Sequence, residues 1–509
     1  MTYDIILFTD LAGYYGHIKS LGAYRLASEL REHGYTVKVV DFVCKLITNE
    51  KLFKTLLDSL IGTNTLFVGW SSNFFGIYSQ NDRENHSNGS SIDGVASRYP
   101  TEEKKFSMWL KYIKKKFSTK IVYGGACAYE NADLVDDIDY VVVGLADATI
   151  IDLANHLKNQ TSLKFRPSMT HKWKILDYDK LGGSFNFSSS VTTLTDADHI
   201  TNGEVLTLET SRGCMFKCKF CGYPLLGRKK TDPAYHRNQD CLSNELLYNW
   251  DKFKTNKYII VDDTFNETVS KLELMLRARD EAKIDLELTA YLRIDILNKF
   301  PEQIKLLKDM GLKAAFFGVE SFNDKTASSV GKGAGSERVK AMLYQIKDEF
   351  GSEFCSQVGL IAGLPYETPD TFNEGMEWVL EHNSPIDSVR ISPLSIRDRT
   401  FPSEFDKDYE KYGYTLTNNG GWVNDVWDSR KAVDIAEYFH KIAYDSRKQK
   451  LGNFELFGLM NYGHKRSEIK DIPIKDLNWG MFKNNLSDYY INYVNTLLEY
   501  ENIDYKGII

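Results

Sequence analysis

The sequence predicts an α/β protein made of two parallel sheets, followed by a mostly helical C-terminal region. Short apolar runs alternate with amphipathic helical stretches through residues 1–160 and again through 205–395. Many of these runs end in Gly, Ser or Asp, and the spacing of apolar residues after about residue 429 is helical. Strands joined by helices form parallel sheets, and the ligands of such sheets bind at the carboxyl ends of the strands.

Residues 1–160 are expected to form a doubly wound sheet. The expected helices cover residues 21–33 and 104–117, and the expected strands are 5–9, 36–42, 64–70, 120–123 and 139–143. Gly and Ser follow several of these strands, and they let a flat ligand approach the backbone. The candidate ligand-binding residues of this unit are therefore Ser71, Ser72, Gly124, Gly125 and Gly144.

Two polar stretches interrupt the pattern. Residues 77–100 are rich in Ser, Asn and Gly, and they predict a long loop that is either a lid or a disordered insertion. Residues 161–204 are also mixed and polar, and we interpret them as the linker into the next domain.

Three cysteines follow the apolar run at 205–208. Cys214, Cys218 and Cys221 have the spacing C-x3-C-x2-C. Lys217, Lys219 and Arg228 lie nearby, and positive surroundings favour the thiolate that binds metal. Three thiolates can hold three corners of a four-iron cluster and leave the fourth iron open to a ligand.

A structural zinc site is the alternative for these cysteines, together with unrelated thiols. Zinc would require a fourth Cys or His close by. The nearest downstream candidates, His236 and Cys241, lack the tight paired spacing of a zinc finger. The spacing therefore favours iron–sulfur over zinc.

Residues 205–395 contain six candidate strands, each followed by a polar cluster. The strands are expected at 205–208, 258–261, 286–291, 314–318, 357–362 and 388–391. The clusters after the second, third and fourth of them contain Asp262 with Asp263, Arg293, and Glu320 with Ser321. In barrels of parallel strands the chemistry lies at the carboxyl ends, where these residues fall.

The cysteine triplet, preceded by a strand and with the aromatic Phe220 between its last two cysteines, resembles the signature of the radical S-adenosylmethionine (SAM) superfamily. The resemblance implies a partial (β/α)6 barrel and a 4Fe-4S cluster whose open iron binds SAM. One electron from the cluster would then cleave SAM to a 5′-deoxyadenosyl radical. The cofactors carry this chemistry, and the protein positions them.

The resemblance extends to the segments YIIVDDTFN and YLRID. In the first, Asp262 or Asp263 would lie near the SAM amino group, although Asp263 could also cap a helix. In the second, the forked donors of Arg293 would approach the SAM carboxylate. An ion pair at the barrel mouth is the alternative for Arg293.

The segments FFGVES and GLIAGLPYET also resemble this family. Glu320 and Ser321 would lie beside SAM and substrate, with Glu320 as the candidate catalytic residue. In the second segment, Gly359, Ile361 and Gly363 would pack against adenine. A turn from strand to helix, with Thr368 as the N-cap, is compatible with the same residues.

Residues 1–160 resemble the cobalamin-binding domain that precedes many radical SAM cores. The matching segments are LASELREHGYTVKVVDF, VYGGACA and DYVVVGLADAT. The chain departs from that family at Gly144-Leu145, where a Gly-Glu pair is usual, and it lacks the Asp-x-His-x-x-Gly motif. His17 lies in the corresponding loop but in the context GYYGHIKS, so Tyr14 and Tyr15 are alternatives for the lower face of the cofactor. The resemblance implies the domain fold and leaves open whether cobalamin is bound.

Residues 396–509 are expected to form a mostly helical cap that closes the barrel and helps to select substrate. Helices are expected at 429–448 and 486–500. Tyr and Trp cluster upstream of them, and these aromatic rings either stack on a planar substrate or fill the core.

Composition excludes several other classes. The net charge of -7 argues against a general nucleic-acid surface, and no apolar run is long enough to predict a membrane span. Seven cysteines, three of them clustered, do not predict a disulfide framework, so a reducing cytoplasm is expected. The first residues, MTYDIILFTD, lack the basic region of a signal peptide.

These features together predict a radical SAM enzyme that functionalises an unreactive carbon, with cobalamin-dependent methyl transfer as the expected reaction. Rearrangement, oxidation or sulfur insertion without cobalamin is the first alternative. A non-catalytic iron–sulfur or zinc protein that acts as a sensor or electron relay is the second. The expected partners are a small-molecule or peptide substrate and an electron donor such as flavodoxin or ferredoxin.

Overall fold

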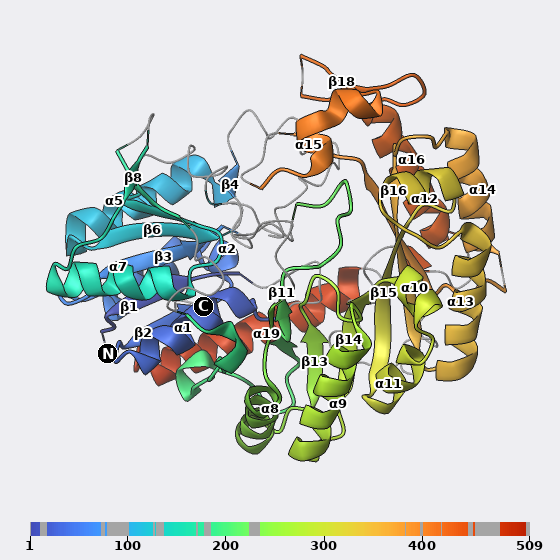
Figure 1. Ribbon diagram of the computed structural model, residues 1–509. Coiled ribbons are helices and arrows are strands. Elements are labelled where there is room, and N and C mark those ends of the chain that lie inside the picture. The colour runs from blue at the N-terminus through green and yellow to red at the C-terminus, as the bar shows by residue number, and fades with distance from the viewer. Residues whose placement is uncertain are drawn as a thin grey trace.

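The computed structural model describes residues 2–10, 18–72, 77–78, 101–125, 128, 137–168, 172–177, 185–222, 235–381, 383–397, 401–418, 420–445, 451–452 and 479–504. Two α/β units lie side by side, and the cysteine loop that follows β11 (Ser211–Arg212) lies between them (Figure 1). The predicted fold class is confirmed, because each unit is built on a largely parallel sheet.

The N-terminal sheet has the strand order β2-β1-β3-β6-β7-β9-β8. Its five predicted strands are present as β1 (Ile5–Phe8), β2 (Val37–Val40), β3 (Phe67–Ser71), β6 (Lys120–Gly125) and β7 (Tyr140–Val143), all parallel. Two further strands, β8 (Arg166–Pro167) and β9 (Lys174–Leu176), extend the sheet into the stretch that we interpreted as a linker. Because β1 pairs with both β2 and β3, the direction of winding reverses at the carboxyl ends of β1 and β3.

Helices cover both faces of this sheet, as expected for a doubly wound fold. α1 (Leu21–Glu32) and α7 (Asp147–Asn159) pack on the face that presents Ile5 and Val142. α3 (Glu50–Leu60) and α5 (Glu103–Phe117) pack on the face of Ile6 and Val141. The alternation along each strand reflects the two-residue period of β-structure.

The second sheet has the order β10-β13-β14-β15-β16-β17-β20 and is parallel throughout. The six predicted strands are confirmed, and the two-residue β20 (Leu451–Gly452) adds a seventh at the edge. The six are β10 (Leu206–Leu208), β13 (Lys257–Ile260), β14 (Glu287–Leu292), β15 (Leu312–Glu320), β16 (Cys355–Ala362) and β17 (Ser388–Pro393). The connecting helices are α8 (Gln239–Phe253), α9 (Val269–Ala282), α10 (Ile294–Lys299), α11 (Gln303–Asp309), α12 (Asp324–Ser329), α13 (Ser336–Phe350) and α14 (Pro369–Leu380).

Side chains alternate between the two faces of this barrel sheet. Leu288, Ala315, Phe317, Val358 and Leu360 belong to the core formed with the outer helices. On the other face, Ile259 packs with Val205, Tyr291 and Ile18, and Ile18 comes from the N-terminal unit. Ile18, which lies just before α1, therefore reaches the inner face of the barrel sheet.

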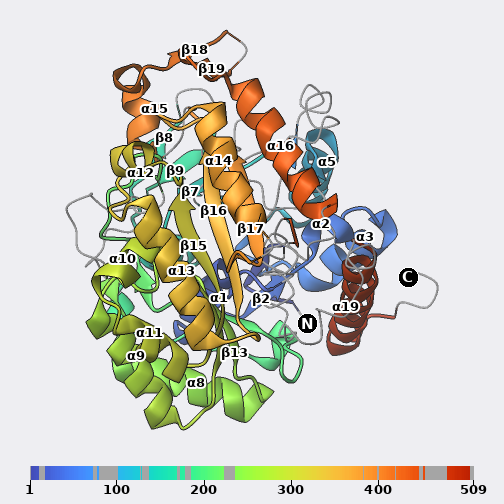
Figure 2. The same ribbon diagram turned by 90° about the vertical axis from the view of Figure 1, so that its right-hand side faces the viewer.

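The C-terminal region does not form one cap over the barrel. α16 (Ser429–Asp445) packs on β17 and α14, while α19 (Trp479–Tyr500) lies against the N-terminal unit near α3 (Figure 2). The Lys38 ammonium lies 2.9 Å from the carboxylate of Glu501, and the backbone amide of Asp41 donates to the Tyr493 hydroxyl at 2.8 Å. The expectation of a single cap is therefore corrected for α19, which covers the N-terminal sheet.

No helix in the described part of the chain is long and apolar enough to cross a membrane.

Candidate active site

The three cysteines lie on the loop that leaves β11, and their half-buried side chains form no disulfide with another described cysteine. Two backbone hydrogen bonds hold this loop: Lys219 donates to Val330 at 3.1 Å, and Phe405 donates to Lys219 at 3.1 Å. Gly331, with φ +91°, lies beside the backbone of Cys218. Segments from β15–α13 and from the C-terminal region thus fix the position of the cysteine loop.

Two of the thiols contact polar groups of neighbouring strands. Cys214 Sγ lies 3.4 Å from Thr264 Oγ1, and Arg293 Nη1 donates to Cys218 Sγ at 2.9 Å. Within the described ranges, no three Cys, His, Asp or Glu side chains converge on a single metal-ion position. The two contacts hold Cys214 and Cys218 against the segments that follow β13 and β14.

The electrostatic surroundings of Cys214 differ from the predicted positive environment. Lys219 is paired with Glu404 at 2.8 Å, and Arg228 lies outside the described residues. Burial raises the pKa of Cys214, and the nearby carboxylates of Asp263 and Glu267 raise it further. Metal binding itself must then deprotonate this thiol.

Asp262 is held inside the protein by a buried network. Its carboxylate accepts hydrogen bonds from the backbone amides of Thr210 at 2.7 Å and Ser211 at 3.1 Å, and it pairs with Lys271 at 2.8 Å. Lys271 also pairs with Glu267 at 3.2 Å. The Asp262 carboxylate therefore fixes the backbone that leads into the cysteines.

Asp263 lies differently from its neighbour. Its side chain is exposed, and the carboxylate has no hydrogen-bond or ion-pair partner among the described residues. Of the two predicted acids, Asp263 is the one that can accept a ligand. The helix that follows is capped by Thr268, which accepts from Lys271, so the alternative role of Asp263 as its cap is not realised.

Arg293 is buried, and its donors are already engaged. Nε and Nη2 bind Asp295 at 3.0 and 2.6 Å, Nη2 also donates to the carbonyl of Gly331 at 2.9 Å, and Nη1 reaches Cys218. The guanidinium lies 4.1 Å from the centre of the Phe216 ring. The structure therefore places Arg293 against the cysteine loop, in the ion pair that was its alternative role.

Glu320 ends β15 in a strained backbone conformation. Its φ is +68°, which is costly for a residue with a side chain, and its carboxylate pairs with Lys332 at 3.1 Å. Lys332 also donates to the carbonyl of Gly318 at 3.0 Å. A Cβ at Gly318 would lie 2.7 Å from Glu320 Oε1, so the glycine makes room for this pair.

Ser321 donates a short hydrogen bond to Glu367, which is 2% exposed. Among the residues that the structure describes, the second carboxylate oxygen of Glu367 has no hydrogen-bond partner. Burial raises the pKa of Glu367 to about 8, against the opposing hydrogen bond from Ser321. Ser321 is thus tied to a carboxyl group that is neutral over most of the physiological pH range.

The glycines predicted to face adenine are closely covered by aromatic side chains. A Cβ at Gly359 would lie 2.5 Å from the Phe316 ring, and one at Gly363 would lie 2.5 Å from the Trp422 ring. Gly363 also has φ +96°, which favours glycine. Ile361 is half-buried between them, and Phe220 packs against the barrel core.

The carboxyl edge of the N-terminal sheet brings its predicted residues together. Ser71 pairs in register with Gly124, Ser72 donates its amide to the Gly124 carbonyl at 2.7 Å, and Gly144 donates to the Gly125 carbonyl at 3.1 Å. The Ser72 hydroxyl is buried and has no hydrogen-bond partner within the described ranges. His17, Tyr14, Tyr15 and most of 77–100 lie outside the described residues.

Sequence reasoning missed three residues that the structure brings into the site. Lys332 lies between two glycines, Glu367 follows the turn after a strand, and Lys271 is aligned with Met275 on the buried face of α9. The helical position of Lys271 was a usable signal, because an apolar face rarely carries an unpaired cation.

Comparison with known proteins supports this arrangement. Residues 208–379 match the Radical SAM superfamily. An uncharacterized methyltransferase of Pyrococcus horikoshii is 30% identical over 175 residues, which are 34% of this chain and 35% of that protein. The match therefore spans only about a third of the length of this curated relative.

Two solved structures share the fold at low sequence identity. The radical SAM methyltransferase TsrM from Kitasatospora setae, with cobalamin and a [4Fe-4S] cluster bound, aligns with TM-score 0.59 and 14% identity over 82% of this chain and 76% of that chain. The cobalamin-dependent SAM radical enzyme OxsB, with aqua-cobalamin and SAM bound, aligns with TM-score 0.57 and 14% identity over 98% of this chain and 75% of that chain. The fold match includes the N-terminal unit, and the segment at residues 208–379 is the part of the chain that matches the radical SAM superfamily.

Proposed function

We propose that this protein is a radical SAM enzyme that transfers a methyl group to an unreactive carbon with the help of cobalamin. The observation that carries the proposal is the placement of Cys214, Cys218 and Cys221 on one loop at the carboxyl edge of the radical SAM sheet. The same loop lies between the two α/β units (Figure 1).

The three cysteines would hold the cluster, and the exposed, unpaired Asp263 carboxylate would accept hydrogen bonds from the SAM ammonium group. When bound, the cluster and SAM supply the radical that abstracts hydrogen, and the corrinoid carries the methyl group. Arg293 would hold the Cys218 sulfur in place through its Nη1 donor rather than bind SAM, because Asp295 and Gly331 occupy its Nε and Nη2 donors.

Glu320 remains the candidate catalytic residue. Its pairing with Lys332 neutralises a buried charge at the strand end, and the strained backbone at Glu320 is typical of functional positions. Lys332 lies at the end of β15, where it contacts Glu320 and the Gly318 carbonyl, and we assign it the role of meeting the SAM carboxylate.

The N-terminal unit supports the cobalamin part of the proposal. The buried Ser72 hydroxyl, at the point where the winding reverses, has no partner in the part of the chain that the structure describes, and Gly124, Gly125 and Gly144 border it. An unpaired buried hydroxyl is costly unless a ligand satisfies it. TsrM and OxsB, whose structures hold cobalamin, share this fold.

The two alternatives remain open to experiment. A radical SAM enzyme without cobalamin would use the N-terminal unit as a scaffold and would catalyse rearrangement or oxidation. A non-catalytic iron–sulfur or zinc protein would use the loop as a sensor. For the enzyme, we propose an electron donor of the flavodoxin or ferredoxin class and a small-molecule or peptide substrate.

The test uses anaerobically reconstituted protein incubated with SAM and a strong reductant. We expect bound iron and the formation of 5′-deoxyadenosine, together with S-adenosylhomocysteine when cobalamin is added. Cys218→Ala should abolish the cluster and both products, while the matched control Cys241→Ala should retain them. Full turnover by the Cys218 variant would refute the assignment.

Uptake of cobalamin is measured separately by absorption spectroscopy after reconstitution. A corrinoid spectrum that stays with the folded protein supports methyl transfer. Product formation from SAM without any corrinoid uptake would instead favour the first alternative.

A further inference from the structure

A buried ion pair joins the N-terminal sheet to the cysteine loop. Asp147 is the first residue of α7 and follows Gly144 at the carboxyl end of β7. Its carboxylate accepts hydrogen bonds from Arg212 Nη1 at 2.6 Å and Nη2 at 3.1 Å, which is a bidentate contact. Arg212 ends β11, two positions before Cys214. One carboxylate therefore connects the two edges where the cofactors are proposed to bind.

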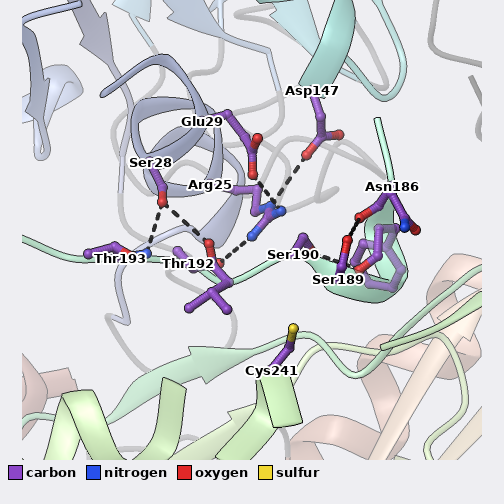
Figure 3. Close-up of polar contacts among 12 residues, drawn as sticks. Arg25, Ser28, Glu29, Asp147, Asn186, Ser189, Ser190, Thr192, Thr193 and Cys241 are labelled. Atoms are coloured by element: carbon purple, nitrogen blue, oxygen red, sulfur yellow. Dashed lines mark hydrogen bonds and ion pairs between the residues drawn. The ribbon is translucent and has the colours of Figure 1, made fainter. Parts of the chain in front are cut away.

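Two further groups extend this pair into a charged network. Arg25 of α1 donates from Nε to Asp147 at 3.4 Å, from Nη2 to Glu29 at 2.7 Å and from Nη1 to the Thr192 hydroxyl at 3.2 Å (Figure 3). Glu209 accepts from Arg212 at 2.9 and 3.2 Å. Acids and arginines alternate through the network, so each charge has an opposite neighbour.

The segment that connects the two units is tied into the same network. Ser28 of α1 accepts a hydrogen bond from the Thr193 amide at 2.9 Å (Figure 3). The Thr192 amide donates to Glu245 of α8 at 2.7 Å, and Glu245 also binds Arg237 at 2.7 Å. The connecting segment is thus hydrogen-bonded to α1 of the N-terminal unit and to α8 of the second unit.

Burial makes this network sensitive to the loss of one member. The side chains of Asp147, Arg25 and Arg212 are 3%, 4% and 7% exposed. Burial alone would raise the pKa of Asp147, but Arg212 and Arg25 overcome this and lower it. Paired buried charges that satisfy both oxygens of a carboxylate leave little geometric freedom.

We propose that Asp147 is a positioning residue that fixes the cysteine loop relative to the Gly144 edge of the N-terminal sheet. It acts through Arg212, and it keeps the cluster site and the corrinoid site at a constant separation. The inference rests on the proposed function only where it names a cluster site and a corrinoid site. The coupling between the cysteine loop and the Gly144 edge follows from the contacts alone.

The test is hydrogen–deuterium exchange on the full-length reconstituted protein with Asp147→Asn. We expect exchange to accelerate in the peptides that contain β7 and the cysteine loop, by about tenfold or more, a change that corresponds to about 1.4 kcal/mol in the opening equilibrium. The matched control is Asp177→Asn, which removes an exposed ion pair with Arg166 in the same unit and should change neither peptide. Unchanged exchange in the cysteine loop, or a uniform increase over the whole chain, would overturn the proposal.

A double variant, Asp147→Asn with Arg212→Gln, separates positioning from simple stability. Because it removes an anion and a cation together, it should fold even if the single variant does not. Positioning predicts that the thermal midpoint recovers while the cysteine loop still exchanges rapidly and a larger share of cleaved SAM ends as 5′-deoxyadenosine without methylated product. Recovery of slow exchange in the cysteine loop and of the wild-type product ratio, together with the thermal midpoint, would contradict it.

Absence of any SAM cleavage in the wild type would count against the proposed function. The exchange result would then decide the coupling by itself.

Discussion

The predicted ligand-binding residues at the carboxyl edges of the two sheets differ in charge. At the barrel edge, charged side chains are paired with one another, as in Lys271 with Asp262 and Lys332 with Glu320. At the edge of the N-terminal sheet, the predicted ligand-binding residues after β3, β6 and β7 are Gly and Ser, and the Ser72 hydroxyl has no partner among the described residues. A charged edge suits a zwitterionic ligand such as SAM, whereas a neutral, small-residue edge suits the close approach of a large flat ring.

The largest expected effect tests the charged edge. Lys271→Met keeps the length of the side chain but leaves Asp262 and Glu267 buried without their cation, so we expect a loss of about 3–5 kcal/mol in the free energy of unfolding. Chemical denaturation measures it. Lys54→Met, which breaks an exposed pair with Asp58, is the control and should cost under about 0.5 kcal/mol. Equal losses in the two variants would show that the barrel edge does not depend on its buried charges.

A smaller effect concerns pH. The pKa of Glu367 is about 8 in the folded protein, against an ordinary value of 4.5. Between these values the unfolded chain has released a proton that the folded protein retains, so this group's contribution is complete below pH 4.5 and is lost as pH rises toward 8. Glu367→Gln stays neutral, and it should therefore gain about 2–4 kcal/mol relative to wild type between pH 5 and pH 8. Parallel stability curves for the two proteins over this range would contradict the prediction.

Gly363→Ala tests how closely the C-terminal aromatic residues cover the barrel edge. The added Cβ would lie 2.5 Å from the Trp422 ring at φ +96°, and we expect a loss of about 1–3 kcal/mol. Gly413→Ala is the matched control, because Gly413 also has a positive φ, +82°, but no atom within 4 Å of the added carbon. The difference in thermal midpoint between the two variants isolates the contact with Trp422, and a difference of zero would mean that the ring simply moves aside.

The smallest effect belongs to the neutral edge. Ser72→Ala removes a buried hydroxyl without a partner, so the protein without cobalamin should gain up to about 1 kcal/mol in stability. The same variant should bind cobalamin more weakly in an absorption titration. A loss of stability, with unchanged cobalamin binding, would mean that the hydroxyl serves the fold and not a ligand.

Most of the two sheets could be predicted from the sequence because their signal is local. Each of the six barrel strands is an apolar run followed by a polar cluster, and this pattern depends only on neighbouring residues. The interaction partners of the polar side chains could not be predicted. Asp262 and Asp263 are adjacent in sequence, yet one is buried against Lys271 and the other is exposed, because the buried partner comes from the next helix.

The position of α19 shows the same limit at greater distance. Its helical period is visible in the sequence, but the period does not identify the surface on which the helix packs. Tyr493 meets the backbone of Asp41, and Phe42 lies 5.3 Å from the Tyr493 ring, across 452 positions of sequence in the first contact. Contacts of this kind carry no local signal, which is why a cap over the barrel was expected instead.

This long-range contact has a consequence for synthesis on the ribosome. At about 5–20 residues per second, about 20–90 s separate the emergence of Asp41 from that of Tyr493. During this interval the aromatic surface around Phe42 is not covered by α19, and Lys38 lacks its ion pair with Glu501. The nascent N-terminal unit therefore keeps part of its apolar surface exposed until α19 leaves the exit tunnel.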